Sequence, residues 1–193
     1  PATGVRLPKH QQIKKLKMYT YRFIATVFIL SIVTGYTSAG ENNSYLDINK
    51  PIIAIKNVNE QAEAWAVCAA SYDVIAEIIS AKAANAKQMR DFANGAELAV
   101  MISIVVNDID DDITSKKFAS LWAFAKVAAK SIPETKLTMM MAEAELLGDK
   151  GVNQFIEKVT NTVKTCMGNL EGQQTYIETW RELAKSGLLE LPQ

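Results

Sequence analysis

The sequence contains little histidine, cysteine, proline or glycine. His10 is the single histidine in 193 residues, and the chain has two cysteines, five prolines and nine glycines. Because proline and glycine interrupt or weaken helices, their scarcity leaves long stretches free to be helical. Sustained alternation of apolar and polar residues, which is typical of half-buried strands, is missing beyond the short sequence PIIAIKNV. These absences favour an all-α fold.

Acidic residues are missing from the first forty residues. Basic residues surround Met18, the short apolar run FIATVFILSIVTGY follows, and the small residues TSAG come next. This order predicts a signal peptide within residues 1–39, with cleavage after Ala39 or Gly40, and therefore a periplasmic or secreted protein. The apolar run is shorter than the roughly 20 residues that span a membrane. The alternative is an inner-membrane protein anchored by this segment, if it stays uncleaved.

Loss of residues 1–40 would change both the charge and the available chemistry. Six of the 21 basic residues and none of the 21 acidic ones lie there, so 15 basic and 21 acidic residues would remain, a net charge of −6. We therefore expect no nucleic-acid partner, because general nucleic-acid binding depends on an excess of Lys and Arg. His10 would also be lost, which excludes His-based catalytic triads and His-ligated zinc or haem. We expect no cofactor and no enzymatic activity; carboxylate-based catalysis is the remaining enzymatic possibility.

The rest of the chain divides into three parts. Residues 40–57 are polar and turn-prone, and we expect a flexible segment there. Residues 58–187 form the predicted domain, and residues 188–193 form a tail. Apolar residues recur three and four positions apart through the domain, which predicts a single bundle of five or six mostly antiparallel helices.

Several short patterns predict where the helices begin and end. Asn57 or Asn59 suits the cap of the first helix, and Thr114 or Ser115 that of the third. The sequence SIPE at residues 131–134 has the spacing of a capping box and predicts either a new helix or a kinked continuation. The sequence GDKG at residues 148–151 predicts a helix end.

The two cysteines fall on predicted inward stripes of different helices. Cys68 lies in WAVCAASYDVI, between Trp65 and Tyr72, and Cys166 lies on the stripe that includes Val159 and Val163. In an exported protein this placement predicts a structural disulfide. Two buried free thiols, or a reactive or metal-binding role, are the alternatives.

Two sequence patterns resemble metal sites only in part. Asp108, Asp110 and Asp112 match the start of an EF-hand loop, but Ile113 replaces its glycine and Ala119 its bidentate glutamate. The run Met139–Met141 contains three thioethers, yet successive helical residues diverge by about 100° and do not converge on one ion. We predict no metal site.

Aromatic and methionine side chains are the remaining candidates for a ligand pocket, although most such residues simply fill a core. We expect a non-enzymatic, exported module that binds an unidentified protein of the cell envelope. The alternative is a carrier or sensor of a small apolar ligand held between helices. The candidate core or pocket residues are Trp65, Tyr72, Met101, Trp122, Met140, Tyr176 and Trp180.

Overall fold

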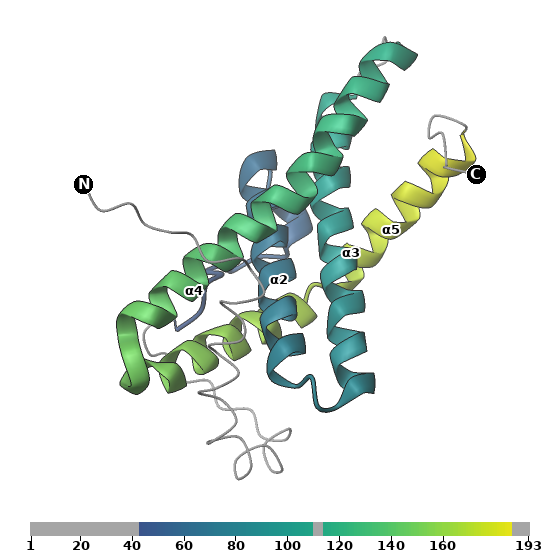
Figure 1. The fold of residues 1–193 in the computed structure, drawn as a ribbon. Coiled ribbons are helices and arrows are strands. Elements are labelled where there is room, and N and C mark those ends of the chain that lie inside the picture. The colour runs from purple at the N-terminus through teal and green to yellow at the C-terminus, as the bar shows by residue number, and fades with distance from the viewer. Residues whose placement is uncertain (1–42, 110–113, 187–193) are drawn as a thin grey trace, which may run out of the picture.

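The computed structural model describes residues 43–109 and 114–186, which form an all-helical bundle (Figure 1). No strand occurs in these two ranges, so the predicted all-α class is confirmed. The elements are the 3-10 helix η1 (Ile52–Ala54) and the helices α2 (Val58–Ile78), α3 (Ala83–Asp108), α4 (Ser115–Met167) and α5 (Leu170–Lys185).

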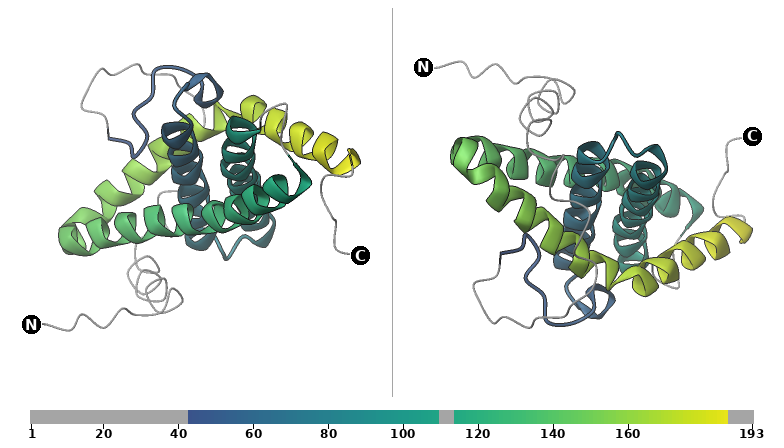
Figure 2. Two further views of the ribbon diagram at one scale, coloured as in Figure 1. Left: turned by 90° about the horizontal axis from the view of Figure 1, so that it is seen from above. Right: turned by 90° about the horizontal axis from the view of Figure 1, so that it is seen from below.

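Helix α4 reverses direction, so that its two halves lie on two sides of α2. Gly148 has φ +60° and ψ −159°, a conformation that residues with a side chain rarely adopt, and it divides α4 into a first arm (residues 115–147) and a second arm (residues 149–167). Figure 2 shows α2 nearly end on between these two arms, and α3 between the first arm and α5. The turn at GDKG is therefore confirmed, and it makes α4 a V-shaped clamp.

Helix α2 lies at the centre of the bundle. The sequence predicted one apolar stripe along it, but nearly every residue from Ala62 to Val74 is buried. Many of these residues are alanines, whose small side chains let neighbouring helices approach on all sides. Helix α2 packs against both α3 and α4, and α5 packs against α3.

The helix caps follow the predicted residue types. The Asn57 side chain accepts hydrogen bonds from the backbone N–H groups of Asn59 and Glu60 at 3.0 and 3.3 Å. Thr114 accepts one from the backbone of Lys117 at 3.3 Å. Polar side chains at these positions satisfy N–H groups that the helix itself leaves unpaired.

The SIPE sequence does not start a new helix. The first arm of α4 runs through Pro133, and Ser131 lies inside it, where its hydroxyl donates to the Ala128 carbonyl at 3.5 Å. Thr135 donates its hydroxyl to the Ser131 carbonyl at 2.8 Å. Both hydroxyls bond to carbonyls of the same helix. Helix α4 therefore continues through SIPE, and the predicted capping box does not form.

Cys68 and Cys166 form the predicted disulfide. Both residues are fully buried, their Cα atoms are 5.6 Å apart, and 98 positions separate them in sequence. The bond joins the centre of α2 to the second arm of α4. The alternative interpretations as free or reactive thiols are therefore wrong.

The segment before α2 packs on the bundle. We expected a flexible segment at residues 40–57, whereas residues 43–57, which we call the strap, bury Leu46, Ile52 and Ile55. The backbone N–H of Tyr45 donates to Thr162 Oγ1 at 2.9 Å, and that of Ile52 donates to Asn169 Oδ1 at 2.8 Å. These apolar and polar contacts make the strap part of the domain.

The predicted leader and the tail at residues 188–193 lie outside the described residues, as do Asp110, Asp112 and Ile113 of the calcium-like sequence. Within the described ranges, none of the helices is both long and apolar enough to cross a membrane. Export therefore stays a prediction from the sequence.

We predict that Cys68→Ser lowers the free energy of unfolding by about 4–5 kcal/mol, because the disulfide no longer restricts the unfolded chain. Denaturant titration of the wild type, with and without reductant, measures this difference. Reduced wild type should unfold close to Cys68→Ser. Rapid alkylation of both cysteines in the folded, unreduced protein would contradict the bond.

Candidate binding surfaces

Most of the predicted pocket residues pack the core. Trp65 and Tyr72 are fully buried, and the Trp65 ring meets Tyr176 edge-on with centroids 5.8 Å apart. Met140 is also buried, beside α2. These four side chains therefore contribute packing at the centre of the bundle.

The other three predicted pocket residues lie nearer the surface. Trp122 and Trp180 are partly buried and pack around Phe118, Val105 and Ala125, where α3, the first arm of α4 and α5 meet. Met101 borders both this cluster and a surface groove described below. The seven residues thus belong to several environments and do not share one cavity.

Gln61 fixes the strap to the bundle, a role that the sequence pattern did not indicate. It is only 7% exposed, and its side-chain nitrogen donates to the carbonyls of Ile52, Ile53 and Ile55 at 3.1–3.2 Å. Its side-chain oxygen accepts a hydrogen bond from the Tyr176 hydroxyl at 2.8 Å. A single amide therefore joins the strap, α2 and α5.

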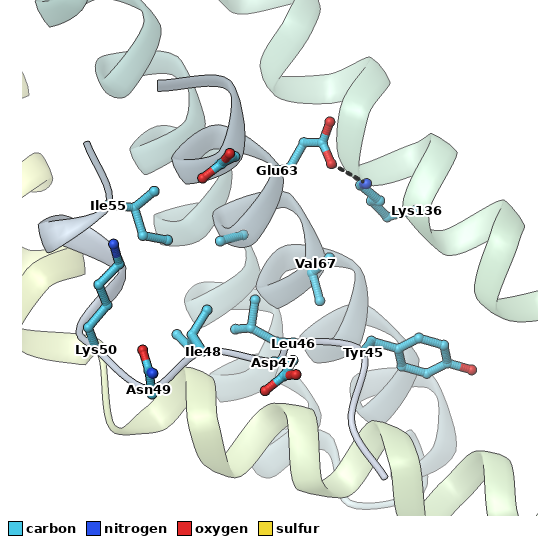
Figure 3. Close-up of a pocket in the computed structure, with 12 residues that line it drawn as sticks. Tyr45, Leu46, Asp47, Ile48, Asn49, Lys50, Ile55, Glu63, Val67 and Lys136 are labelled. Atoms are coloured by element: carbon cyan, nitrogen blue, oxygen red, sulfur yellow. Dashed lines mark hydrogen bonds and ion pairs between the residues drawn. The ribbon is translucent and has the colours of Figure 1, made fainter. Parts of the chain in front are cut away.

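A hollow of about 380 Å³ lies between the strap, the start of α2 and the first arm of α4 (Figure 3). Leu46, Ile48, Ile55 and Val67 supply its apolar lining. An ion pair borders it, with Lys136 Nζ on α4 2.8 Å from Glu63 Oε2 on α2. We call this feature the strap hollow.

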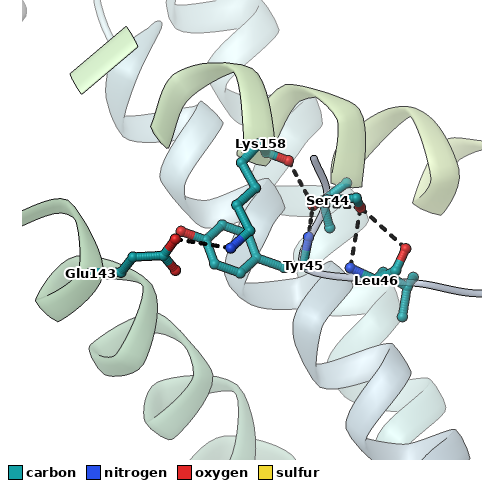
Figure 4. A network of polar contacts seen from close by, with 6 residues as sticks. Ser44, Tyr45, Leu46, Glu143 and Lys158 are labelled. Atoms are coloured by element: carbon teal, nitrogen blue, oxygen red, sulfur yellow. Dashed lines mark hydrogen bonds and ion pairs between the residues drawn. The ribbon is translucent and has the colours of Figure 1, made fainter. Parts of the chain in front are cut away.

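The N-terminal end of the strap contacts both arms of α4 (Figure 4). Lys158 Nζ, on the second arm, lies 4.2 Å from the centroid of the Tyr45 ring and 2.9 Å from Glu143 Oε1 on the first arm. Burial and the nearby Glu143 carboxylate raise the pKa of the Tyr45 hydroxyl. The hydroxyl therefore stays protonated, and this cluster attaches the strap to both arms of α4.

A second hollow, the α3–α4 groove, runs between α3 and the first arm of α4. Its volume is about 670 Å³, and its apolar residues include Leu98, Met101, Ala123 and Val127. Val127 is 67% exposed, and Phe124, one turn before it on α4, is 62% exposed. The polar lining residues are Asn94, Glu97, Lys126, Lys130, Ser131 and Glu134.

We find no cluster of metal-ligating side chains in residues 43–109 and 114–186. No group of three or more His, Cys, Asp or Glu side chains in these ranges is placed to hold a metal ion. In the methionine run, Met140 and Met141 are buried whereas Met139 is 61% exposed. The three thioethers therefore diverge, as the helical geometry predicted.

Burial alone raises the pKa of the Tyr72 hydroxyl. Its hydroxyl is fully buried and has no hydrogen-bond partner in the described part of the chain, and burial raises its pKa. Its ring lies 5.5 Å from that of Phe92 on α3, away from both hollows. The raised pKa therefore reflects core packing.

Comparisons with known proteins give no relative. No known protein family, curated protein or solved structure matches this chain.

We predict that Gln61→Leu lowers the free energy of unfolding by about 2–4 kcal/mol, because it leaves buried carbonyls and the Tyr176 hydroxyl without their partner. Gln174→Leu is the matched control, since Gln174 is exposed on α5 and should change stability little. Denaturant titration of both variants measures the difference. Equal stability of the two would contradict the role of Gln61.

Proposed function

We propose that this protein is an exported, non-enzymatic module that binds another protein through the α3–α4 groove. The observation that carries the proposal is the apolar groove beside two large exposed side chains, Phe124 and Val127. Contiguous exposed apolar side chains mark interaction surfaces more often than single ones do, and Val127 joins Phe124 to the apolar lining of the groove.

The composition of the groove supports a helical segment as its ligand. Its two walls are helices that contribute both apolar and polar residues, and apolar grooves between helices can bind the apolar face of an amphipathic helix. Leu98 and Met101 on α3 face the same groove as Ala123 and Val127 on α4. A partner helix would cover these side chains and remove them from water.

Two observations support the exported location. The basic and apolar order before residue 40 is that of a signal peptide. The buried disulfide between Cys68 and Cys166 is of the kind that persists in oxidising compartments. A partner in the cell envelope fits this location.

We predict that a photo-crosslinking amino acid at Val127 forms a discrete protein adduct in the producing cells. The same amino acid at Gln174, exposed on α5, is the control and should not form that adduct. Phe124→Ser should remove most of the Val127 adduct without lowering the melting temperature, because Phe124 is mostly exposed. Equal labelling from both positions, or none from Val127, would contradict protein binding at the groove.

A second candidate function is binding of a small apolar ligand in the strap hollow. Its volume of about 380 Å³ lies within the range of small-molecule pockets, about 300–1,000 Å³. The specific observation in favour is its lining by Leu46, Ile48, Ile55 and Val67 beneath a charged border.

For this second function we predict that native mass spectrometry of freshly purified protein shows a bound small molecule. Ile48→Asp should abolish the added mass, because it places a charge in the apolar lining. A wild-type mass equal to that of the chain alone would contradict the carrier function and leave protein binding as the explanation.

A further inference from the structure

We propose that the segment bound at the α3–α4 groove is an acidic amphipathic helix of the partner protein. This inference rests on the proposed function and adds the chemistry of the partner. It comes from the charge of the first arm of α4, which differs in sign from the expected charge of the exported chain.

The beginning of the first arm carries only positive charge. Between residues 115 and 133 it contains four lysines and no acidic residue. All four lysines are exposed, and none forms an ion pair with another residue of the described ranges at 4.0 Å or less. We call the exposed side chains of this stretch the basic face: Lys116, Lys117, Phe124, Lys126, Val127 and Lys130.

Helical spacing places the charges around the apolar pair. Val127 is three residues after Phe124 and three before Lys130, and residues three or four apart are neighbours on a helix surface. Lys126 and Lys130 are one turn apart, and both line the α3–α4 groove. A bound helix would therefore meet the ammonium groups of Lys126 and Lys130 together with the apolar side chain of Val127 on the α4 wall.

Acidic residues also occur near the basic face and limit what it can attract. Glu134 lies at one end of the groove, and Glu97 lies on the α3 wall, where it already has an intramolecular partner. Asp110–Asp112 precede Lys116 in the sequence and lie outside the described residues. The positive charge available at the groove is therefore centred on Lys126 and Lys130, and the inference depends on these two.

An acidic protein segment fits this surface better than an anionic membrane does. A helix that lies on a membrane needs a continuous apolar face, whereas the only large apolar residues exposed on the basic face are Phe124 and Val127. A flat lipid surface covering α4 would also bring phosphate groups towards Glu97 on the opposite wall. A helix of limited width can contact Lys126 and Lys130 and enter the groove.

The direct test uses a synthetic peptide of about 18 residues, long enough for five helical turns, with leucines on one face and glutamates on the other. The control peptide replaces every glutamate with glutamine. Fluorescence anisotropy with the purified protein should show about tenfold tighter binding of the glutamate peptide at low salt. At about 0.5 M NaCl the difference should nearly vanish, because salt screens exposed charges.

Charge reversal locates the effect on the protein. Lys126→Glu combined with Lys130→Glu should remove the preference for the glutamate peptide, while circular dichroism and melting temperature stay close to wild type. Lys56→Glu is the matched control, since Lys56 is exposed on the strap, and should keep the preference. The glutamine peptide should bind wild type and the double variant with similar affinity.

Each other outcome has a distinct meaning. Equal binding of both peptides, or a preference that survives the double variant, overturns the acidic partner and leaves protein binding at the groove intact. Binding of neither peptide also overturns it, and the Val127 crosslink then decides the proposed function separately. Lysine-dependent binding to vesicles of equimolar phosphatidylglycerol and phosphatidylcholine, with no peptide preference, overturns it in favour of a membrane.

Discussion

The enclosure of α2 is the constraint on which the rest of the structure depends. A helix with apolar or small residues on every side is stable only when other elements cover all of them. The α3 hairpin partner covers one side, and the two arms of α4 cover others because Gly148 lets α4 turn back. The Cys68–Cys166 bond then fixes the second arm to the centre of α2. The outer face of the first arm is left exposed, and the candidate partner surface lies there.

The sequence was sufficient for the helical class, for each of the two caps to within a pair of neighbouring candidates, for the helix end in GDKG and for the disulfide. The helices, caps and helix end follow from local sequence patterns. The disulfide follows because the chain has only two cysteines. The strap was not predicted, because its attachment depends on a buried amide, Gln61, whose partners lie in η1 and α5. A polar residue within a helix gives no sign in sequence of which distant carbonyls it will meet.

The candidate surfaces were less predictable than the fold. The sequence directed attention to large aromatic residues, and most of these fill the core because burial of a large apolar side chain is favourable. The candidate partner surface instead contains Phe124 and Val127, which look like ordinary core residues in sequence. Only the packing of α4 against α3 shows that the buried face of the arm is taken by Phe118, Ala125 and Ala129. Exposure is a property of the assembled bundle.

The strap contacts also constrain the order of folding. Ser44 meets Thr162 across 118 positions, and Ile52 meets Asn169 across 117. Contacts this distant in sequence form late, since a long loop must close before they contribute any stability. A chain that emerges from its N-terminus cannot make the Ser44–Thr162 contact until the second arm of α4 has appeared. The N-terminal end of the strap therefore stays unattached as long as only the residues before the turn at Gly148 have been synthesised.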